Sequence, residues 1–162
     1  MSTDLPVPGQ FDSAIDDEVR RLRIIYASDL PDKVAQLRSL VADMQENKAN
    51  LSPVNEIFRA AHSMKGAASM YGFQTLADLG AALDEVLYPL LKGAKPVTDG
   101  ICDLCVEWLT AISDVAASSE KGVERSAADY AVFHRLQKLS QLENDRMDDR
   151  GKNCRPGRPD PA

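Results

Sequence analysis

The sequence lacks several features that would assign it to a large class of proteins. Basic residues are outnumbered, 19 against 25 acidic ones, and the net charge of −6 disfavours a basic surface for nucleic acid. No apolar run approaches the roughly 20 residues that a membrane-spanning helix requires. Cysteines number 3, which is too few, and an odd number, for a disulfide framework. A glycine-rich phosphate-binding loop is also missing, which argues against a complete kinase that uses ATP.

Both ends of the chain contain several prolines and are expected to be disordered. Pro6 and Pro8 lie in residues 1–10, and three prolines with two glycines lie in residues 147–162. Residues 1–10 also lack the basic and apolar regions of a secretory signal peptide. The sequence therefore predicts one domain at 11–146, a disordered tail at 1–10, and a disordered tail or linker at 147–162. We expect the protein to be cytoplasmic and to bind neither nucleic acid nor a membrane.

Between these ends, apolar residues recur with the spacing of a helix. Intervals of three and four residues predict helices at about 12–29, 31–48, 53–71, 74–91, 98–119 and 127–146. Runs that alternate between apolar and polar residues are missing, and aromatic residues make up only 6% of the chain, so strands are not expected. Four of the helices have similar lengths and short connections. We therefore predict an all-α fold, an antiparallel up-down four-helix bundle with one or two flanking helices.

Short signals indicate where these helices begin and end. Pro31 separates the first two, because proline is disfavoured in the interior of a helix. Ser52, which precedes a proline, is typical of a helix start, and Gly72 is typical of a helix end. Ser126, with Asp129 three residues later, resembles a capping box at the start of the last helix.

His62 lies on the polar side of the helix predicted at 53–71. With about 100° between successive residues, the apolar stripe of this helix consists of Ile57, Ala61, Met64, Ala68 and Tyr71. The opposite side carries Phe58, Arg59, His62, Lys65, Gly66 and Ser69. We interpret this polar side as an exposed surface with His62 near its middle.

Three neighbours distinguish His62 from an ordinary surface histidine. Gly66 costs roughly 1 kcal/mol relative to alanine in a helix, and it leaves the imidazole uncovered because helical side chains lean toward the N-terminus. The ammonium of Lys65, one turn away, could bind an anion attached to the ring. Phe58 is a large apolar residue on a polar side, which indicates a docking surface.

An uncovered histidine of this kind can act as a nucleophile and hold a phosphoryl group on one ring nitrogen. The other ring nitrogen then needs a partner that fixes its proton. Asp84 lies on the flank of the helix predicted at 74–91, where its carboxylate could reach that nitrogen. Gly80, one turn before Asp84, would permit the two helices to approach closely.

Other residues that could carry chemistry favour a structural interpretation. His134 also lies away from the apolar residues of its helix, but no glycine exposes it and no acid is placed to orient it. Cys102 and Cys105 form a Cys-x-x-Cys pair inside a helix without a second pair, so we interpret them as packing residues. Neither histidine has a glutamate three residues before it, as a di-iron bundle would need. We expect no metal site and no cofactor.

The residues around His62 resemble the pattern of the histidine-containing phosphotransfer (Hpt) family. That pattern is a histidine followed by lysine at +3, glycine at +4 and +10, leucine at +14, and a leucine–acid pair at +21 and +22. The chain has each of them, as His62, Lys65, Gly66, Gly72, Leu76 and Leu83-Asp84. Glutamate is commoner than aspartate at the last position. The run from Asn55 to His62 is most similar to the N-terminal phosphotransfer domain of chemotaxis-type histidine kinases.

The resemblance implies a role for each residue. His62 would accept a phosphoryl group at Nε2, from a histidine kinase catalytic domain or a receiver-domain aspartate, and pass it to a response-regulator aspartate. Lys65 would stabilise the phosphoryl oxygens, Asp84 would orient the imidazole, and Gly66 would give the partner access. Any Mg²⁺ would belong to the partner's active site, and the chain would be a monomer. Three further residues would line the docking surface: Phe58, Arg59 and Ser69.

A second function stays open at this point. An adaptor of the same fold could use the Phe58–Ser69 side to bind a signalling partner without any phosphorylation. A pure adaptor has no need of the combination of His62, Lys65, Gly66 and Asp84, so we favour the phosphoryl carrier.

Overall fold

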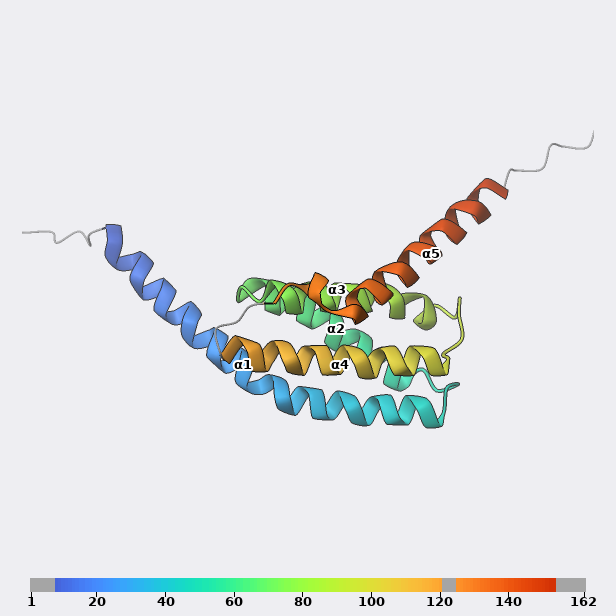
Figure 1. The fold of residues 1–162 in the computed structure, drawn as a ribbon, viewed down its shortest axis with the longest axis horizontal. Helices are drawn as coiled ribbons and strands as arrows, with labels where there is room; N and C mark the ends of the chain where they lie inside the picture. Colours follow the sequence, from blue (N-terminus) through green and yellow to red (C-terminus); the bar gives the residue numbers. More distant parts are fainter. Residues whose placement is uncertain (1–7, 121–124, 154–162) are drawn as a thin grey trace, which may run out of the picture.

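The computed structural model describes residues 8–120 and 125–153, which form helices joined by short loops. The helices are α1 (Pro8–Glu46), α2 (Ser52–Met70), α3 (Gln74–Leu91), α4 (Asp99–Glu120), the short 3-10 helix η1 (Ala127–Asp129) and α5 (Ala131–Asn153). Helices α1 to α4 pack in sequence order around one core, with α4 beside α1, and α5 packs against α3 and α4 (Figure 1). Within the described ranges, no residue belongs to a strand. The predicted all-α bundle is confirmed.

Helix α1 differs from the prediction. The two helices expected at 12–29 and 31–48 are one helix of 39 residues with Pro31 inside it. Leu30 and Val34 are buried in the core on either side of Pro31, which is itself exposed. Because packing holds the helix on both sides, the proline does not end it, and prolines in such positions bend a helix instead. The N-terminal half of α1 projects beyond the bundle at an angle to the rest (Figure 1).

The helices also run past the predicted domain boundaries. Helix α1 begins at Pro8 and α5 continues to Asn153, so residues 8–10 and 147–153 are helical where the sequence predicts disordered tails. A proline in the first turn is compatible with this start, because its missing N–H would have no partner there. The rest of both predicted tails lies outside the described residues. Within the described ranges, no helix is both long and apolar enough to cross a lipid bilayer.

Gly72 shapes the turn that sends α3 back along α2. Its φ of +80° lies in the left-handed region, which favours glycine. The N–H of Phe73 donates to the carbonyl oxygen of Ala68 at 2.8 Å, and the N–H of Gly72 donates to that of Ser69 at 3.2 Å. These bonds satisfy the last carbonyls of α2, and the predicted helix end is confirmed.

Two other helix starts differ in detail from the prediction. Ser126 and Asp129 form the predicted capping box, but they cap η1, and α5 begins only at Ala131. Ser52 does not cap α2 with its side chain; instead its N–H donates to Oδ1 of Asn50 at 3.1 Å. The serine before a proline therefore predicts where α2 begins, but not which hydrogen bond is made at its N-terminus.

Trp108 connects α4 to α3 inside the core. Its side chain is fully buried, and its Nε1–H donates to the carbonyl oxygen of Leu79 at 2.9 Å. Leu76 and Leu83 are fully buried on α3 as well. Helix α3 is thus held by the core, while another of its sides packs against α2.

We expect Trp108→Phe to lower the free energy of unfolding by about 1–3 kcal/mol, because it removes the hydrogen bond to Leu79 and leaves volume unfilled. Urea denaturation followed by circular dichroism measures the change. The control is Val106→Ala, at an exposed position of the same helix, which should change the value by less than about 0.5 kcal/mol. Equal effects of the two substitutions would contradict the role of the indole.

Candidate functional site

His62 lies near the middle of α2, on a side that faces solvent. Its side chain is 66% exposed, while its neighbours Ala61 and Met64 are buried in the core. Successive helical residues differ by about 100°, so the apolar stripe and the imidazole point in different directions. The exposure of the ring therefore follows from the spacing of the apolar residues.

Asp84 reaches the His62 ring from the neighbouring helix α3. Its Oδ2 lies 3.1 Å from Nδ1 of His62, and its side chain is only 15% exposed. An ionised carboxylate only accepts hydrogen bonds, so this partner assigns a proton to Nδ1. In the neutral ring, Nε2 then holds the lone pair. The contact therefore leaves Nε2 as the nucleophilic nitrogen of a largely exposed imidazole.

One turn after His62, Gly66 leaves open space beside the ring and Lys65 provides a positive charge. A Cβ placed on Gly66 would meet nothing within 4 Å, so this glycine is not needed for helix packing. Lys65 is exposed, and within the described part of the chain no carboxylate pairs with its ammonium. A negatively charged group attached to His62 would therefore find open space and a nearby cation.

An aromatic pair borders His62 toward the N-terminus of α2. The Phe58 ring lies 6.0 Å from the His62 ring, between centroids, with 22° between their planes. Tyr88 of α3 lies 6.2 Å from Phe58 and is 52% exposed. Sequence reasoning missed Tyr88, because it searched for docking residues on one helix only. The available signal was spacing, since Tyr88 is four residues after Asp84 and therefore on the same side of α3.

The other predicted docking residues lie on the same side of α2. Arg59 and Ser69 are exposed, one turn before and two turns after His62. The structure thus brings the predicted residues of two helices to one surface, which we call the His62 surface. Its members are Phe58, Arg59, His62, Lys65, Gly66 and Ser69 of α2 with Asp84 and Tyr88 of α3.

His134 is exposed as well, but the backbone holds its ring. Its Nε2 lies 2.7 Å from the carbonyl oxygen of Ala128. A carbonyl oxygen only accepts, so Nε2 of His134 carries the proton of this bond. The nitrogen that is free in His62 is therefore occupied in His134, which agrees with the structural interpretation of this residue.

The cysteines of the Cys-x-x-Cys pair are buried, free thiols. Burial raises the pKa of Cys105 to about 12, and burial also raises the pKa of Cys102. Both therefore remain protonated at neutral pH, which suits packing rather than redox chemistry. Among the described residues, no group of three or more His, Cys, Asp and Glu side chains is placed to hold a metal ion. That the chain uses no cofactor stays a prediction.

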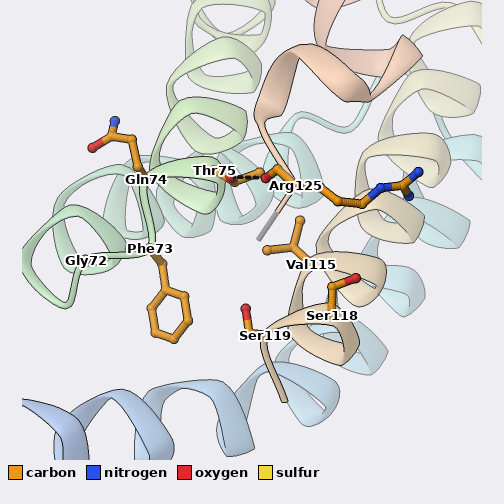
Figure 2. Close-up of a pocket in the computed structure, with 8 residues that line it drawn as sticks. All are labelled: Gly72, Phe73, Gln74, Thr75, Val115, Ser118, Ser119 and Arg125. Carbon is orange, nitrogen blue, oxygen red and sulfur yellow. Dashed lines mark hydrogen bonds between the residues drawn. The ribbon is translucent and has the colours of Figure 1, made fainter. Parts of the chain in front are cut away.

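A pocket of about 50 Å³ lies between the α2–α3 turn and the C-terminal end of α4 (Figure 2). It is lined by Gly72, Phe73, Gln74, Thr75, Val115, Ser118, Ser119 and Arg125. The Thr75 hydroxyl donates to the carbonyl oxygen of Arg125 at 2.5 Å. The Arg125 guanidinium points away from Phe73 (Figure 2) and binds Asp114 at 3.3 Å. The pocket is large enough for a few water molecules at most. None of its lining residues belongs to the His62 surface, so we do not assign it a function.

Known proteins resemble the part of the chain that carries the His62 surface. Residues 21–118 match the family model of the Hpt domain. This range includes α2, α3, nearly all of α4 and the part of α1 that packs in the bundle. It therefore contains every residue of the His62 surface.

Several curated relatives are named chemotaxis protein CheA. The one from Listeria monocytogenes is 27% identical over 117 residues, which is 68% of this chain and 19% of the relative. The one from Salmonella typhimurium is 29% identical over 98 residues, 56% of this chain and 15% of the relative. The one from Bacillus subtilis is 32% identical over 75 residues, 46% of this chain and 11% of the relative.

The chain thus spans no more than 19% of the length of these relatives. The family match, in contrast, covers more than half of the chain and contains the bundle with its exposed histidine. On this basis, and as the residues around His62 suggest, the chain belongs to the Hpt domain family.

Proposed function

We propose that this chain is a phosphoryl carrier in a two-component phosphorelay, with His62 as the phosphoacceptor. The observation that carries the proposal is the contact of Asp84 with Nδ1, which leaves Nε2 as the free nucleophile of an exposed ring. Membership of the Hpt family and similarity to CheA proteins support a phosphotransfer role in two-component signalling. The phosphoryl group would come from a histidine kinase or a receiver domain and go to a response-regulator aspartate.

The transfer to His62 is a displacement at phosphorus. The Nε2 lone pair forms the N–P bond while the bond from phosphorus to the donor's oxygen breaks, and that oxygen keeps the electron pair. The ring then carries a positive charge shared with Nδ1–H, which the adjacent Asp84 carboxylate stabilises. In the return step, a carboxylate oxygen of the receiver attacks phosphorus and Nε2 recovers its electron pair. The proton stays on Nδ1 in both directions, so Asp84 orients the ring throughout.

Lys65 and Gly66 suit a phosphoryl group that moves between two proteins. The three phosphoryl oxygens carry charge in the transition state, and the Lys65 ammonium, one turn from His62, would stabilise it. The open space at Gly66 would let a donor or acceptor approach the ring in line with the N–P bond. Both residues would act on the rate of transfer and contribute little to the fold.

The partner would dock on the His62 surface. The Phe58–Tyr88 pair would supply apolar contact area, with Arg59, Gly66 and Ser69 around the reacting histidine. Receiver domains and kinase catalytic domains are the partners we propose, and any Mg²⁺ would bind in the partner's active site rather than on this chain. The net charge of −6 disfavours nucleic acid as a partner. We further propose a cytoplasmic monomer that binds neither nucleic acid nor a membrane.

Transfer of a radiolabelled phosphoryl group tests the proposal. The chain is mixed with ATP and a CheA catalytic domain, and then with a receiver domain. We expect a label on the chain that is acid-labile and base-stable, absent from His62→Gln and unchanged in His134→Gln, because only His62 has a free Nε2. Label that persists in His62→Gln would show that another residue is the acceptor.

The same experiment addresses the adaptor alternative. A phosphorylation-independent adaptor would bind the receiver through the Phe58–Ser69 side and acquire no label from any donor. Equal binding by the wild type and His62→Gln, together with that absence of label, would replace our proposal with the adaptor function.

Lys65→Ala should slow transfer about 10- to 100-fold, since a hydrogen bond to a charged group contributes about 1.5–3 kcal/mol. Single-turnover kinetics with a phosphorylated receiver domain measure the rate. Lys138→Ala, which removes an exposed lysine from α5, is the control and should leave the rate unchanged. Loss of helical content in Lys65→Ala would instead identify Lys65 as a structural residue.

Gly66→Leu should slow transfer while leaving the unfolding temperature unchanged or raised. The new side chain would lie over the His62 ring, and its Cβ would meet nothing within 4 Å. Replacement of a mid-helix glycine also favours the helix by roughly 0.5–1 kcal/mol. Thermal unfolding and single-turnover kinetics measure the two effects. A large fall in the unfolding temperature would mean that Gly66 is needed for packing.

A further inference from the structure

Helices α2 and α3 lie close together at Gly80, beside the α2 residues that flank His62. A Cβ placed on Gly80 would lie 2.8 Å from the carbonyl oxygen of Ala61, 3.0 Å from the backbone nitrogen of Lys65 and 3.4 Å from Cβ of Met64. Two of these three atoms belong to the α2 backbone, which cannot turn aside as a flexible side chain would. Any residue larger than glycine would therefore force the two helices apart here.

The atoms that Gly80 approaches flank His62, and Asp84 follows Gly80 by one turn of α3. The separation of the helices at Gly80 therefore determines how far the Asp84 carboxylate is from the His62 ring. Leu79, next to Gly80, is fully buried and accepts the hydrogen bond of Trp108. Because the core holds α3 at Leu79, α3 cannot simply rotate to relieve a contact at residue 80.

The reach of Asp84 leaves little room for such a displacement. Relief of the 2.8 Å contact to an ordinary 3.4 Å requires a shift of 0.6 Å, the difference between these two distances. Directed along the line from Nδ1 to Oδ2, which are 3.1 Å apart, that shift gives about 3.7 Å, which is beyond a hydrogen bond. Glutamate has one methylene group more than aspartate and could span the longer gap.

We propose that Gly80 is a positioning residue, which sets the spacing of α2 and α3 so that the short Asp84 carboxylate holds the proton on Nδ1 of His62. Gly80 touches no reacting atom and acts through Asp84 alone. A glycine at 80 and an aspartate at 84 form a matched pair, and a larger residue at 80 requires glutamate at 84. The consequence for phosphoryl transfer rests on the function proposed above, whereas the effect on the ring does not.

Nitrogen-15 NMR of the histidine rings tests the proposal, because a protonated and an unprotonated ring nitrogen differ widely in chemical shift. Spectra are recorded at about pH 8.5, where imidazoles are in general neutral. In the wild type we expect the proton of His62 on Nδ1. In Gly80→Ala we expect the shifts to move to those of Asp84→Ala, where the carboxylate is missing. In the double variant Gly80→Ala/Asp84→Glu we expect the wild-type pattern to return.

The chain supplies two controls. His134 should keep its proton on Nε2 in every variant, because its partner is the backbone carbonyl of Ala128. Gly100→Ala also replaces a helical glycine, but the new Cβ would meet only Oγ1 of Thr98 at an ordinary 3.7 Å. The His62 signals of Gly100→Ala should therefore match those of the wild type.

Two results would overturn the proposal. One is a folded Gly80→Ala whose His62 keeps the wild-type proton position, and the other is a double variant that stays like Asp84→Ala. Should Gly80→Ala unfold, all variants are compared in a Gly100→Ala background, where the added methyl group makes only an ordinary contact and favours α4.

Single-turnover transfer completes the test and separates this proposal from the proposed function. We expect Gly80→Ala to slow transfer by the same factor as Asp84→Ala, and the double variant to recover most of the rate. A chain that accepts no phosphoryl group would refute the proposed function while the NMR result still stood. Normal transfer with no change of the ring in Gly80→Ala would refute only the role of Gly80.

Discussion

The distance between α2 and α3 is the constraint on which the site depends, because the His62–Asp84 contact spans two helices. A hydrogen bond is lost over a few tenths of an ångström, and the contact at 3.1 Å is already near the long end of the usual range. The interior of the bundle provides the required accuracy. Trp108 and the buried leucines hold α3 in the core, and the left-handed turn at Gly72 determines how α3 returns along α2. The geometry of the exposed His62–Asp84 contact thus depends on buried contacts in the core of the bundle.

Gly66 and Gly80 serve this site in opposite ways, although helix propensity treats them alike. At Gly66 the position of a missing side chain is open space, so glycine keeps the ring uncovered on the outside. At Gly80 the same position is filled by the α2 backbone, so glycine allows the second helix to come close. Each glycine costs its helix roughly 1 kcal/mol, and in each case the effect falls on the same imidazole. Gly66 leaves the solvent side of the ring open to an approaching group. Gly80 lets α3 come close enough for Asp84 to contact the ring from the protein side.

Most features that depend on one helix could be predicted from the sequence. Of the features that depend on two helices, the contact of Asp84 with the His62 ring was predicted as well, but others were not. Apolar spacing predicts a helix at 74–91, and α3 spans Gln74–Leu91; the same spacing points His62 outward. The fate of Pro31 could not be predicted, because it depends on the burial of Leu30 and Val34 by other helices. Tyr88 was missed for a related reason, since its contact with Phe58 exists only once α2 and α3 are placed side by side.

The two histidines show why exposure alone does not identify a nucleophile. Both rings are exposed, and both use one nitrogen in a hydrogen bond. At His134 the carbonyl of Ala128 occupies Nε2 and offers only a dipole. At His62 the partner is the Asp84 carboxylate, which contacts Nδ1. Its negative charge would stabilise the positive charge that the ring gains when Nε2 forms a bond. The identity and side of the partner would therefore decide the chemistry that we propose, and at His62 the contact with this partner depends on how closely α3 can approach α2.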